Sequence, residues 1–212
     1  MKKILLVVAH PWYETPKSFQ SNLFENLFVT GVGAYAALFK LNSYLSVVRP
    51  DFIVTVGHCG GANDNVSAGD VIVVDSLRSN DEKLKKFGVV ELDLGKEKEI
   101  RDRVVSDLVA RFVGEDWNCY SGQIESFSRK LVTQRSEIHS NAIAVELEMY
   151  SIVLLAKRYS IPFFGAKIVS DIVPVVPCSF EEQIEKIRSN VKATQPVIDT
   201  VWKVVRKIIQ DS

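Results

Sequence analysis

The pattern of apolar and polar residues alternates between short hydrophobic runs and longer segments with helical spacing. Short runs rich in Val and Ile, several of them apolar on both faces, are typical of strands buried inside a sheet; the clearest are residues 4–9, 52–56, 71–74, 142–145 and 163–169. Apolar residues recur with the period of a helix in residues 34–47, 96–112, 149–158 and 180–209. This order predicts an α/β fold of three layers, α/β/α, with a mixed, mostly parallel central sheet.

The length of the chain bounds its domain organisation. Its 212 residues are enough for one well-buried domain and too few for two comfortable ones. No repeat, low-complexity segment or linker divides the sequence, so we expect a single domain over residues 1–212. Residues 76–86 are polar and charged, which predicts an exposed loop.

The charge balance and the cysteines indicate which kinds of ligand and which cell compartment suit this chain. The 26 basic and 26 acidic residues balance, so nothing indicates a basic face for nucleic acid or an anionic membrane, and we expect a small-molecule ligand. The apolar run at residues 4–9 is too short for a signal peptide, and no stretch approaches the roughly 18–20 apolar residues of a membrane span. The cysteines Cys59, Cys119 and Cys178 are odd in number and widely spaced, which fits a reducing cytoplasm. Neither cysteines nor histidines show metal-ligand spacing, so no metal is expected.

Two acidic residues follow two consecutive predicted strands. Glu148 comes shortly after the run at 142–145, and Asp171 comes directly after the run at 163–169. In an open α/β sheet, ligands bind in the crevice outside the carboxyl ends of the strands, so we expect both acids to face one pocket. Each also has a purely structural interpretation. Glu148 is suited to the first turn of a helix, and Asp171 is suited to a cap or turn.

Glycine-rich turns lie at two places where backbone can approach a ligand. The run at 52–56 leads into Gly57-His58-Cys59-Gly60-Gly61, where missing side chains leave backbone N–H groups accessible. Gly31-Val32-Gly33 precedes the helix predicted from residue 34, and a helix start of this kind favours anions or hydroxyl oxygens. Tight turns without a ligand are the alternative. The third glycine of a dinucleotide fingerprint is missing and no Walker pattern occurs, so no nucleotide cofactor is predicted.

These elements occur together and in an order that resembles the purine nucleoside phosphorylase and nucleosidase superfamily. The matching segments are residues 31–33 with the helix after them, 49–51, 56–61, 67–73, 121–122, 144–148 and 169–171. The most specific part is Val145-Glu146-Leu147-Glu148, followed by an apolar strand and Ser170-Asp171. Within the superfamily the chain is most similar to the methylthioadenosine/S-adenosylhomocysteine nucleosidases. The resemblance implies a homodimer or larger oligomer of nucleoside phosphorylase-like fold that hydrolyses the N-ribosidic bond of a purine nucleoside without metal or organic cofactor.

The resemblance also implies roles for three acids. Glu148 matches the acid that binds the ribose 2′ and 3′ hydroxyls, and Asp171 matches the acid that donates a proton to N7 of the departing purine. Breaking this bond builds positive charge on the sugar and negative charge on the base, so acids at both places lower the same barrier. Apolar neighbours are expected to raise the pKa of Asp171. Glu14 is the candidate for the acid that orients the attacking water, with Glu25 as the alternative; both are also suited to a solvated surface.

Further substrate contacts are expected around these acids. Positions that match the family place Glu146, Leu147, Gly60 and Ser170 at the site. The chain departs from the family at His58, where Ser or Thr is usual, and at Lys167, where Arg is usual. Lys167 keeps the charge but loses the forked geometry, and it is expected to pair with Glu14 or Glu148. Phe127 is a candidate to stack on the base, or else a core residue. Phe180 matches the Phe beside the 5′ substituent, although Ser179 and Glu182 also form a capping box there.

The superfamily catalyses both hydrolysis and phosphorolysis, and the arginine pattern favours water as the nucleophile. Related phosphorylases hold phosphate with arginines, one of them two residues before the glycine that corresponds to Gly57; here that residue is Thr55. No arginine occurs before Arg49, and charge-assisted forks are the usual way to hold a dianion. Phosphorolysis by a purine nucleoside phosphorylase remains an alternative. A second alternative is a non-catalytic, nucleoside-binding relative, because fold does not prove function.

Overall fold

The computed structural model describes residues 1–19, 25–92, 95–128 and 131–212. In these residues the strands are β1 (Ile4–Val8), β2 (Glu25–Val29), β3 (Phe52–Gly61), β4 (Val71–Ser79), β5 (Val90–Glu91), β6 (Cys119–Ser126), β7 (Ala144–Glu146) and β8 (Phe163–Ile172). The helices are α1 (Pro11–Glu14), α2 (Ala34–Leu45), α3 (Gly95–Arg111), α4 (Met149–Arg158) and α5 (Phe180–Asp211), with short 3₁₀ turns η1 (Lys85–Phe87) and η2 (Arg135–Glu137).

The strands form one mixed sheet that closes on itself at one side. Its order is β2-β1-β3-β7-β6-β4-β5, and β8 pairs with both β3 and β4. Five pairings are parallel (β1 with β2, β1 with β3, β3 with β8, β4 with β6, β6 with β7) and three are antiparallel (β3 with β7, β4 with β5, β4 with β8). The prediction of a mixed, mostly parallel sheet is therefore confirmed.

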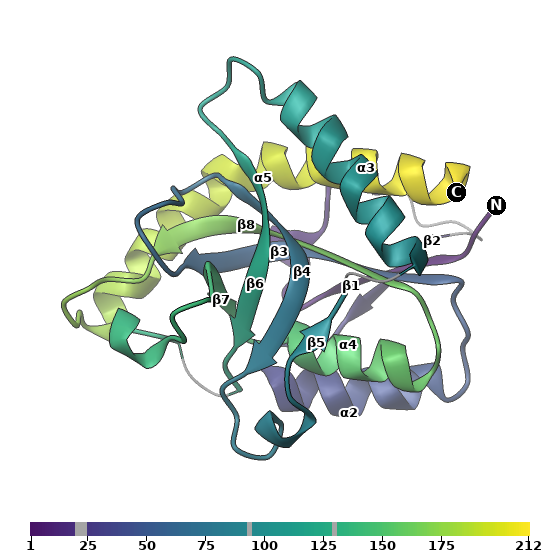
Figure 1. The fold of residues 1–212 in the computed structure, drawn as a ribbon, viewed down its shortest axis with the longest axis horizontal. Coiled ribbons are helices and arrows are strands. Elements are labelled where there is room, and N and C mark those ends of the chain that lie inside the picture. The colour runs from purple at the N-terminus through teal and green to yellow at the C-terminus, as the bar shows by residue number, and fades with distance from the viewer. Residues whose placement is uncertain (20–24, 93–94, 129–130) are drawn as a thin grey trace.

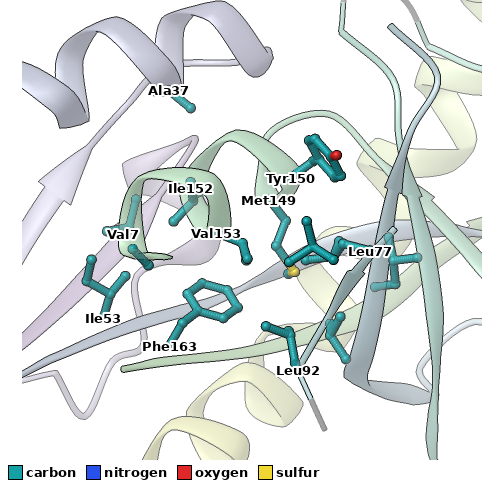
Figure 2. Packing of buried hydrophobic residues seen from close by; sticks show 14 of the residues in the cluster. Val7, Ala37, Ile53, Leu77, Leu92, Met149, Tyr150, Ile152, Val153 and Phe163 are labelled. Atoms are coloured by element: carbon teal, nitrogen blue, oxygen red, sulfur yellow. The ribbon is translucent and has the colours of Figure 1, made fainter. Parts of the chain in front are cut away.

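Helices cover the sheet on both faces, as a three-layer fold requires. In Figure 1, α2 and α4 lie below the sheet and α3 and α5 lie above it. Alternate residues of β1 feed two cores: Leu5 and Val7 pack with α2 and α4, while Leu6 packs with α3 and α5. Figure 2 shows Met149 and Val153 of α4 in the first core, projecting toward Phe163 of β8. The strand runs are apolar on both faces because both faces are buried.

Several boundaries differ from the predictions. The prediction of a loop from residue 76 is wrong for its first residues, because β4 continues to Ser79 and pairs with β6 as far as Ser126. Ser76 and Ser79 are buried there, although they are polar. Strands β2, β5 and β6 were not predicted, since their sequences lack the continuous apolar run of the inner strands. Helix α4 occupies the predicted residues, and none of the helices in the described ranges is long and apolar enough to cross a membrane.

Candidate active site

A pocket opens where β3 and β8 end, and the predicted acids line it. Its empty volume, which includes the open mouth, is about 700 Å³. Its walls come from the first loop, the ends of β3 and β8, the turn from β7 into α4, the segment around residue 132 and the start of α5. The lining residues are Ala9, His10, Glu14, Val32, His58, Cys59, Gly60, Leu131, Val132, Val145, Glu146, Leu147, Glu148, Ser170, Asp171, Val173, Gln183 and Ile187.

A β-bulge turns Asp171 toward this pocket. The register of β3 against β8 shifts between Cys59, which pairs with Val169, and Gly60, which pairs with Asp171. Neighbouring residues of a regular strand point to opposite faces, yet both Ser170 and Asp171 line the pocket. The bulge supplies the extra residue that makes this possible, as bulges next to active sites often do. Asp171 lies inside β8 and not beyond its end, which corrects the predicted boundary.

Glu148 lines the same pocket, but it does not follow the carboxyl end of a strand parallel to β3 as predicted. Strand β7 runs antiparallel to β3 and pairs only with its last two residues, Gly60 and Gly61. The two acids therefore do not both follow the carboxyl ends of parallel strands. The chain in β7 runs back from the end of β3 toward Cys59, and after β7 Glu148 becomes the N-cap residue of α4 at the pocket wall.

The Asp171 carboxyl group is buried and held by two side chains. The Ser170 hydroxyl lies 2.8 Å from Oδ1, and the Gln183 amide nitrogen donates to Oδ2 at 3.2 Å. Burial raises the pKa of Asp171 above its ordinary value, while the hydrogen bonds from Ser170 and Gln183 and the charge of Lys186 oppose the shift. A carboxyl group that keeps its proton at higher pH is suited to donate it to a leaving group.

Glu148 and Glu146 are two neighbouring buried acids, and Glu148 contacts the glycine turn at Gly33. The backbone N–H of Gly33 donates to Glu148 Oε1 at 2.7 Å. Burial raises the pKa of Glu148 to about 8, repulsion by Glu146 adds to the shift, and attraction to Lys167 opposes it. Glu146 accepts hydrogen bonds from the backbone N–H groups of Glu148 and Met149, both at 2.7 Å, and from the Ser126 hydroxyl. Glu146 thus fixes the start of α4 and with it the position of Glu148.

Glu14 points into the pocket and not to solvent. Its Oε2 accepts the backbone N–H groups of Ala9, at 2.6 Å, and His10, at 3.0 Å. Its Oε1 lies 3.4 Å from the backbone nitrogen of His58. A side-chain carbon at Gly57 would stand 2.5 Å from Glu14 Oε1, so a larger residue there would displace the Glu14 carboxyl group from this position. The alternative, Glu25, is buried outside the lining residues and pairs with Arg206.

Lys167 is a buried cation beneath the acids and does not line the pocket itself. Its Nζ lies 3.6 Å from Glu146 Oε2, so its partner is Glu146, whereas Glu14 or Glu148 had been expected. Burial lowers the pKa of Lys167, but the charges of Glu146, Glu14 and Glu148 outweigh burial and raise it above its ordinary value. The lysine therefore stays charged and compensates the cluster of carboxylates.

His58 lines the pocket as an uncharged imidazole at neutral pH. Burial lowers the pKa of His58 to about 4, although the charge of Glu14 raises it and that of Lys167 lowers it further. One ring nitrogen, Nε2, lies 2.9 Å from the hydroxyl of Thr194 on α5. The side chain thus connects β3 with α5 at the edge of the site.

The remaining predicted substrate contacts divide into two groups. Leu147, Gly60 and Ser170 line the pocket. Phe127 is not among its lining residues and packs in a small cluster with Val132, Val145 and Val173 behind the wall, which corresponds to its core alternative. The side chain of Phe180 lies outside the described residues.

Gln183 is a pocket residue that the sequence did not reveal. It is buried at the start of α5 and contacts Asp171. The available signal was its place on the buried face of the helix, four residues before Ile187, where a polar side chain needs a partner. The partners are contributed by segments far away in the sequence, so the local pattern could not identify them.

Replacing Glu148 by Gln is expected to change the pH dependence of stability. The folded-state pKa of about 8 lies above the ordinary value of 4.5, so protonated Glu148 stabilises the fold below about pH 4.5, and this contribution is lost as the pH rises through 8. The amide stays neutral, so the wild type should lose about 3–4 kcal/mol relative to Glu148→Gln between pH 5 and pH 8. Urea unfolding at both pH values measures the difference. Exposed Glu185→Gln is the matched control, and an equal response of both variants contradicts the prediction.

Comparisons with known proteins identify the family to which this chain belongs. A family model described as the phosphorylase superfamily matches residues 26–203. The 5′-methylthioadenosine/S-adenosylhomocysteine nucleosidase of Haemophilus influenzae (strain PittEE) is 24% identical over 153 residues, which are 68% of this chain and 67% of the relative. The nucleosidase of the same name from Tolumonas auensis is 24% identical over 182 residues, 77% of this chain and 76% of the relative.

Solved structures share the fold over the whole length. The methylthioadenosine/S-adenosylhomocysteine nucleosidase of Neisseria meningitidis, in complex with methylthio-immucillin-A, has a TM-score of 0.73 at 17% identity and covers 98% of this chain and 99% of its own. A futalosine hydrolase mutant of Helicobacter pylori has a TM-score of 0.74 at 14% identity and covers 100% of both chains. Because the family model matches residues 26–203, most of the sequence, the chain belongs to the phosphorylase superfamily.

Proposed function

We propose that this protein hydrolyses the N-ribosidic bond of a purine nucleoside, of the methylthioadenosine or S-adenosylhomocysteine type, and releases the free base. The observation that carries the proposal is the convergence of Glu14, Glu148 and Asp171 on one pocket. The names of the relatives support the same reaction, since the nucleosidases of Haemophilus influenzae and Tolumonas auensis are named for these two substrates.

Asp171 is proposed as the general acid. When the bond between the ribose C1′ and the base nitrogen breaks, its electron pair moves to the base, and the proton of Asp171 passes to that base. The base then leaves as a neutral molecule, and Asp171 is left as a carboxylate. The raised pKa of Asp171, which burial causes, keeps the proton available at higher pH than in a solvated acid.

Glu148 is proposed to bind the ribose hydroxyls. Its Oε1 is fixed by the Gly33 N–H at 2.7 Å, and the side chain lines the pocket beside the glycine turn. Ribose hydroxyls that donate to a carboxylate favour its charged form. Since the pKa of Glu148 is about 8 without ligand, nucleoside binding should release a proton from it near neutral pH. The resulting charge stabilises the positive charge that develops on the sugar.

Glu14 is proposed to orient the attacking water. Two backbone N–H groups hold one oxygen of the carboxylate, and the other oxygen faces the end of β3. The water oxygen bonds to C1′ and its proton passes to Glu14. Because Glu14 points into the pocket, the geometry favours turnover over a site that only binds nucleosides.

The charges around the pocket favour water over phosphate as the nucleophile. Among the described lining residues the charged side chains are Glu14, Glu146, Glu148 and Asp171, and none is Lys or Arg. A phosphate dianion is usually held by cationic forks and is repelled by carboxylates. Thr55, which stands where related phosphorylases have an arginine, is buried in β3 and does not line the pocket. Residues 129–130 lie outside the described ranges.

Three further expectations accompany the proposal. We propose that residues 1–212 form one domain, supported by the single sheet, and that the protein is cytoplasmic, supported by the free thiols of its cysteines. We also propose a homodimer. Exposed apolar side chains, among them Phe39, Val47 and Val29, offer surface for an interface, and light scattering measures the oligomeric state.

The decisive experiment measures base release from a panel of purine nucleosides, with and without phosphate. The panel contains methylthioadenosine, S-adenosylhomocysteine, adenosine and inosine. We expect free base and free sugar without phosphate, detected by chromatography. Dependence on phosphate with a sugar 1-phosphate product would identify a phosphorylase. If the wild type cleaves none of these nucleosides under either condition but binds them, the proposal of turnover is wrong and the nucleoside-binding alternative replaces it.

A further inference from the structure

Gln183 is buried between the general acid and the pocket wall, and the reaction as proposed does not use it. Only 2% of the residue is exposed. Its amide nitrogen donates to the backbone oxygen of Val132 at 2.8 Å and to Asp171 Oδ2 at 3.2 Å. The Gln183 side chain of α5 is therefore hydrogen-bonded both to the pocket wall at Val132 and to the carboxyl group of Asp171.

The orientation of the Gln183 amide is fixed by its partners. A backbone carbonyl oxygen can only accept hydrogen bonds, so the nitrogen and not the oxygen of the amide faces Val132. This nitrogen carries two hydrogens, and the second one points to Asp171. Both hydrogens have fixed acceptors, and Gln183 cannot turn without losing both bonds.

The other neighbour of Asp171, the Ser170 hydroxyl, divides its single hydrogen between two acceptors. The Ser170 hydroxyl lies 2.8 Å from Asp171 Oδ1 and 3.1 Å from the backbone oxygen of Cys59. A hydroxyl has one hydrogen and the Cys59 oxygen can only accept, so these two acceptors compete for it. Gln183 is therefore the donor that is committed to Asp171 in every arrangement of the Ser170 hydroxyl.

We propose that Gln183 is a positioning residue for Asp171, which fixes the carboxyl group and stabilises the carboxylate left after the proton has passed to the departing base. This inference rests on the proposed hydrolysis. Before transfer, the amide hydrogen bond fixes one carboxyl oxygen and leaves the proton on the group. After transfer the same bond becomes charge-assisted and stronger. Gln183 thus makes Asp171 a stronger acid than burial alone would allow.

Other charges also act on Asp171 and remain unchanged when Gln183 is replaced. Lys186 on α5 favours the carboxylate, and the thiol of Cys59 on β3 lies close enough for Asp171 to affect its pKa. The other titratable groups of the pocket and its floor are His10, Glu14, His58, Glu146, Glu148 and Lys167. A matched substitution at residue 183 therefore isolates the contribution of one hydrogen bond.

The test is the pH dependence of kcat for Gln183→Met, which keeps the length of the side chain and removes the donor. Loss of the bond should move the alkaline limb of kcat up by about one pH unit and lower kcat about tenfold, since a hydrogen bond to a charged group has roughly this effect. KM should change less than kcat. Gln210→Met is the control, because Gln210 on the same helix donates to the Lys2 carbonyl far from the pocket. A raised KM with an unmoved alkaline limb would show that Gln183 only tethers the wall.

A second measurement does not depend on turnover. Infrared difference spectra of wild type and Asp171→Asn identify the carboxyl band of Asp171, and its titration should shift to higher pH in Gln183→Met or, if that variant does not fold, in Gln183→Leu. An unshifted band overturns the role of Gln183 even if the wild type releases base. If no nucleoside is cleaved, the proposed hydrolysis fails, while the infrared titration still decides whether Gln183 sets the acidity of Asp171.

Discussion

Asp171→Asn is expected to lower the rate of base release by about 10²–10⁴-fold, the usual contribution of a general acid. The amide has nearly the same shape as the carboxyl group and keeps an oxygen for the bond from Gln183, so nucleoside binding should change little. The loss should therefore appear in kcat and not in KM. The variant should also lack the alkaline limb of the wild-type pH profile, because that limb reports loss of the Asp171 proton.

A substrate that needs no acid separates this role from a general loss of structure. Nitrophenyl riboside has a leaving group that departs without protonation, so Asp171→Asn should cleave it nearly as fast as the wild type does. Asp75→Asn is the matched control, because Asp75 lies on β4 and does not line the pocket. Equal losses on the nucleoside and on the nitrophenyl riboside would mean that Asp171 acts on the sugar or on the fold and not on the base.

The inner strands and the acids could be predicted from the sequence for different reasons. Strands β3 and β8 are apolar on both faces because helices cover both sides, and that pattern is local. Strand β6 was missed because it buries Glu125 and Ser126, whose polar atoms bond to Asn80, His139, Glu146 and Tyr150 from distant segments. No local pattern shows that such residues will find partners.

The site shows the same limit. Glu148 and Asp171 stand in a motif that resembles a known family, so their type and spacing were sufficient to predict that both face one pocket. The bulge at Cys59, the reversal of β7 and the bond from Gln183 to Asp171 depend on which strands lie side by side. The partner of Lys167 was predicted wrongly for this reason, since Glu146 is brought near it by β7, which pairs antiparallel with the end of β3.

Lys167→Met is expected to destabilise the fold by about 3–5 kcal/mol near neutral pH, the usual cost of removing one partner of a buried ion pair. Lys167 and Glu146 are both almost fully buried; Glu14 adds to the negative charge nearby, and Glu148 adds more as the pH rises through its pKa of about 8. Without the lysine these carboxylates have no buried cation among the interactions that the structure records for them. Urea unfolding measures the loss. Lys203→Met is the control, since the Lys203 side chain is largely exposed and its pair with Asp199 contributes about 1 kcal/mol at most.

Two further results distinguish lost charge compensation from lost packing. The deficit of Lys167→Met should be smaller at pH 5 than at pH 8, because protonation of Glu148, whose pKa of about 8 burial causes, removes one uncompensated charge. Adding Glu146→Gln should restore part of the stability, since residues in contact are not additive. Lys167→Arg keeps the charge and should lose less than Lys167→Met. If the deficit is the same at both pH values and the double variant restores nothing, Lys167 stabilises the protein by filling space, and the acids of the pocket do not depend on its charge.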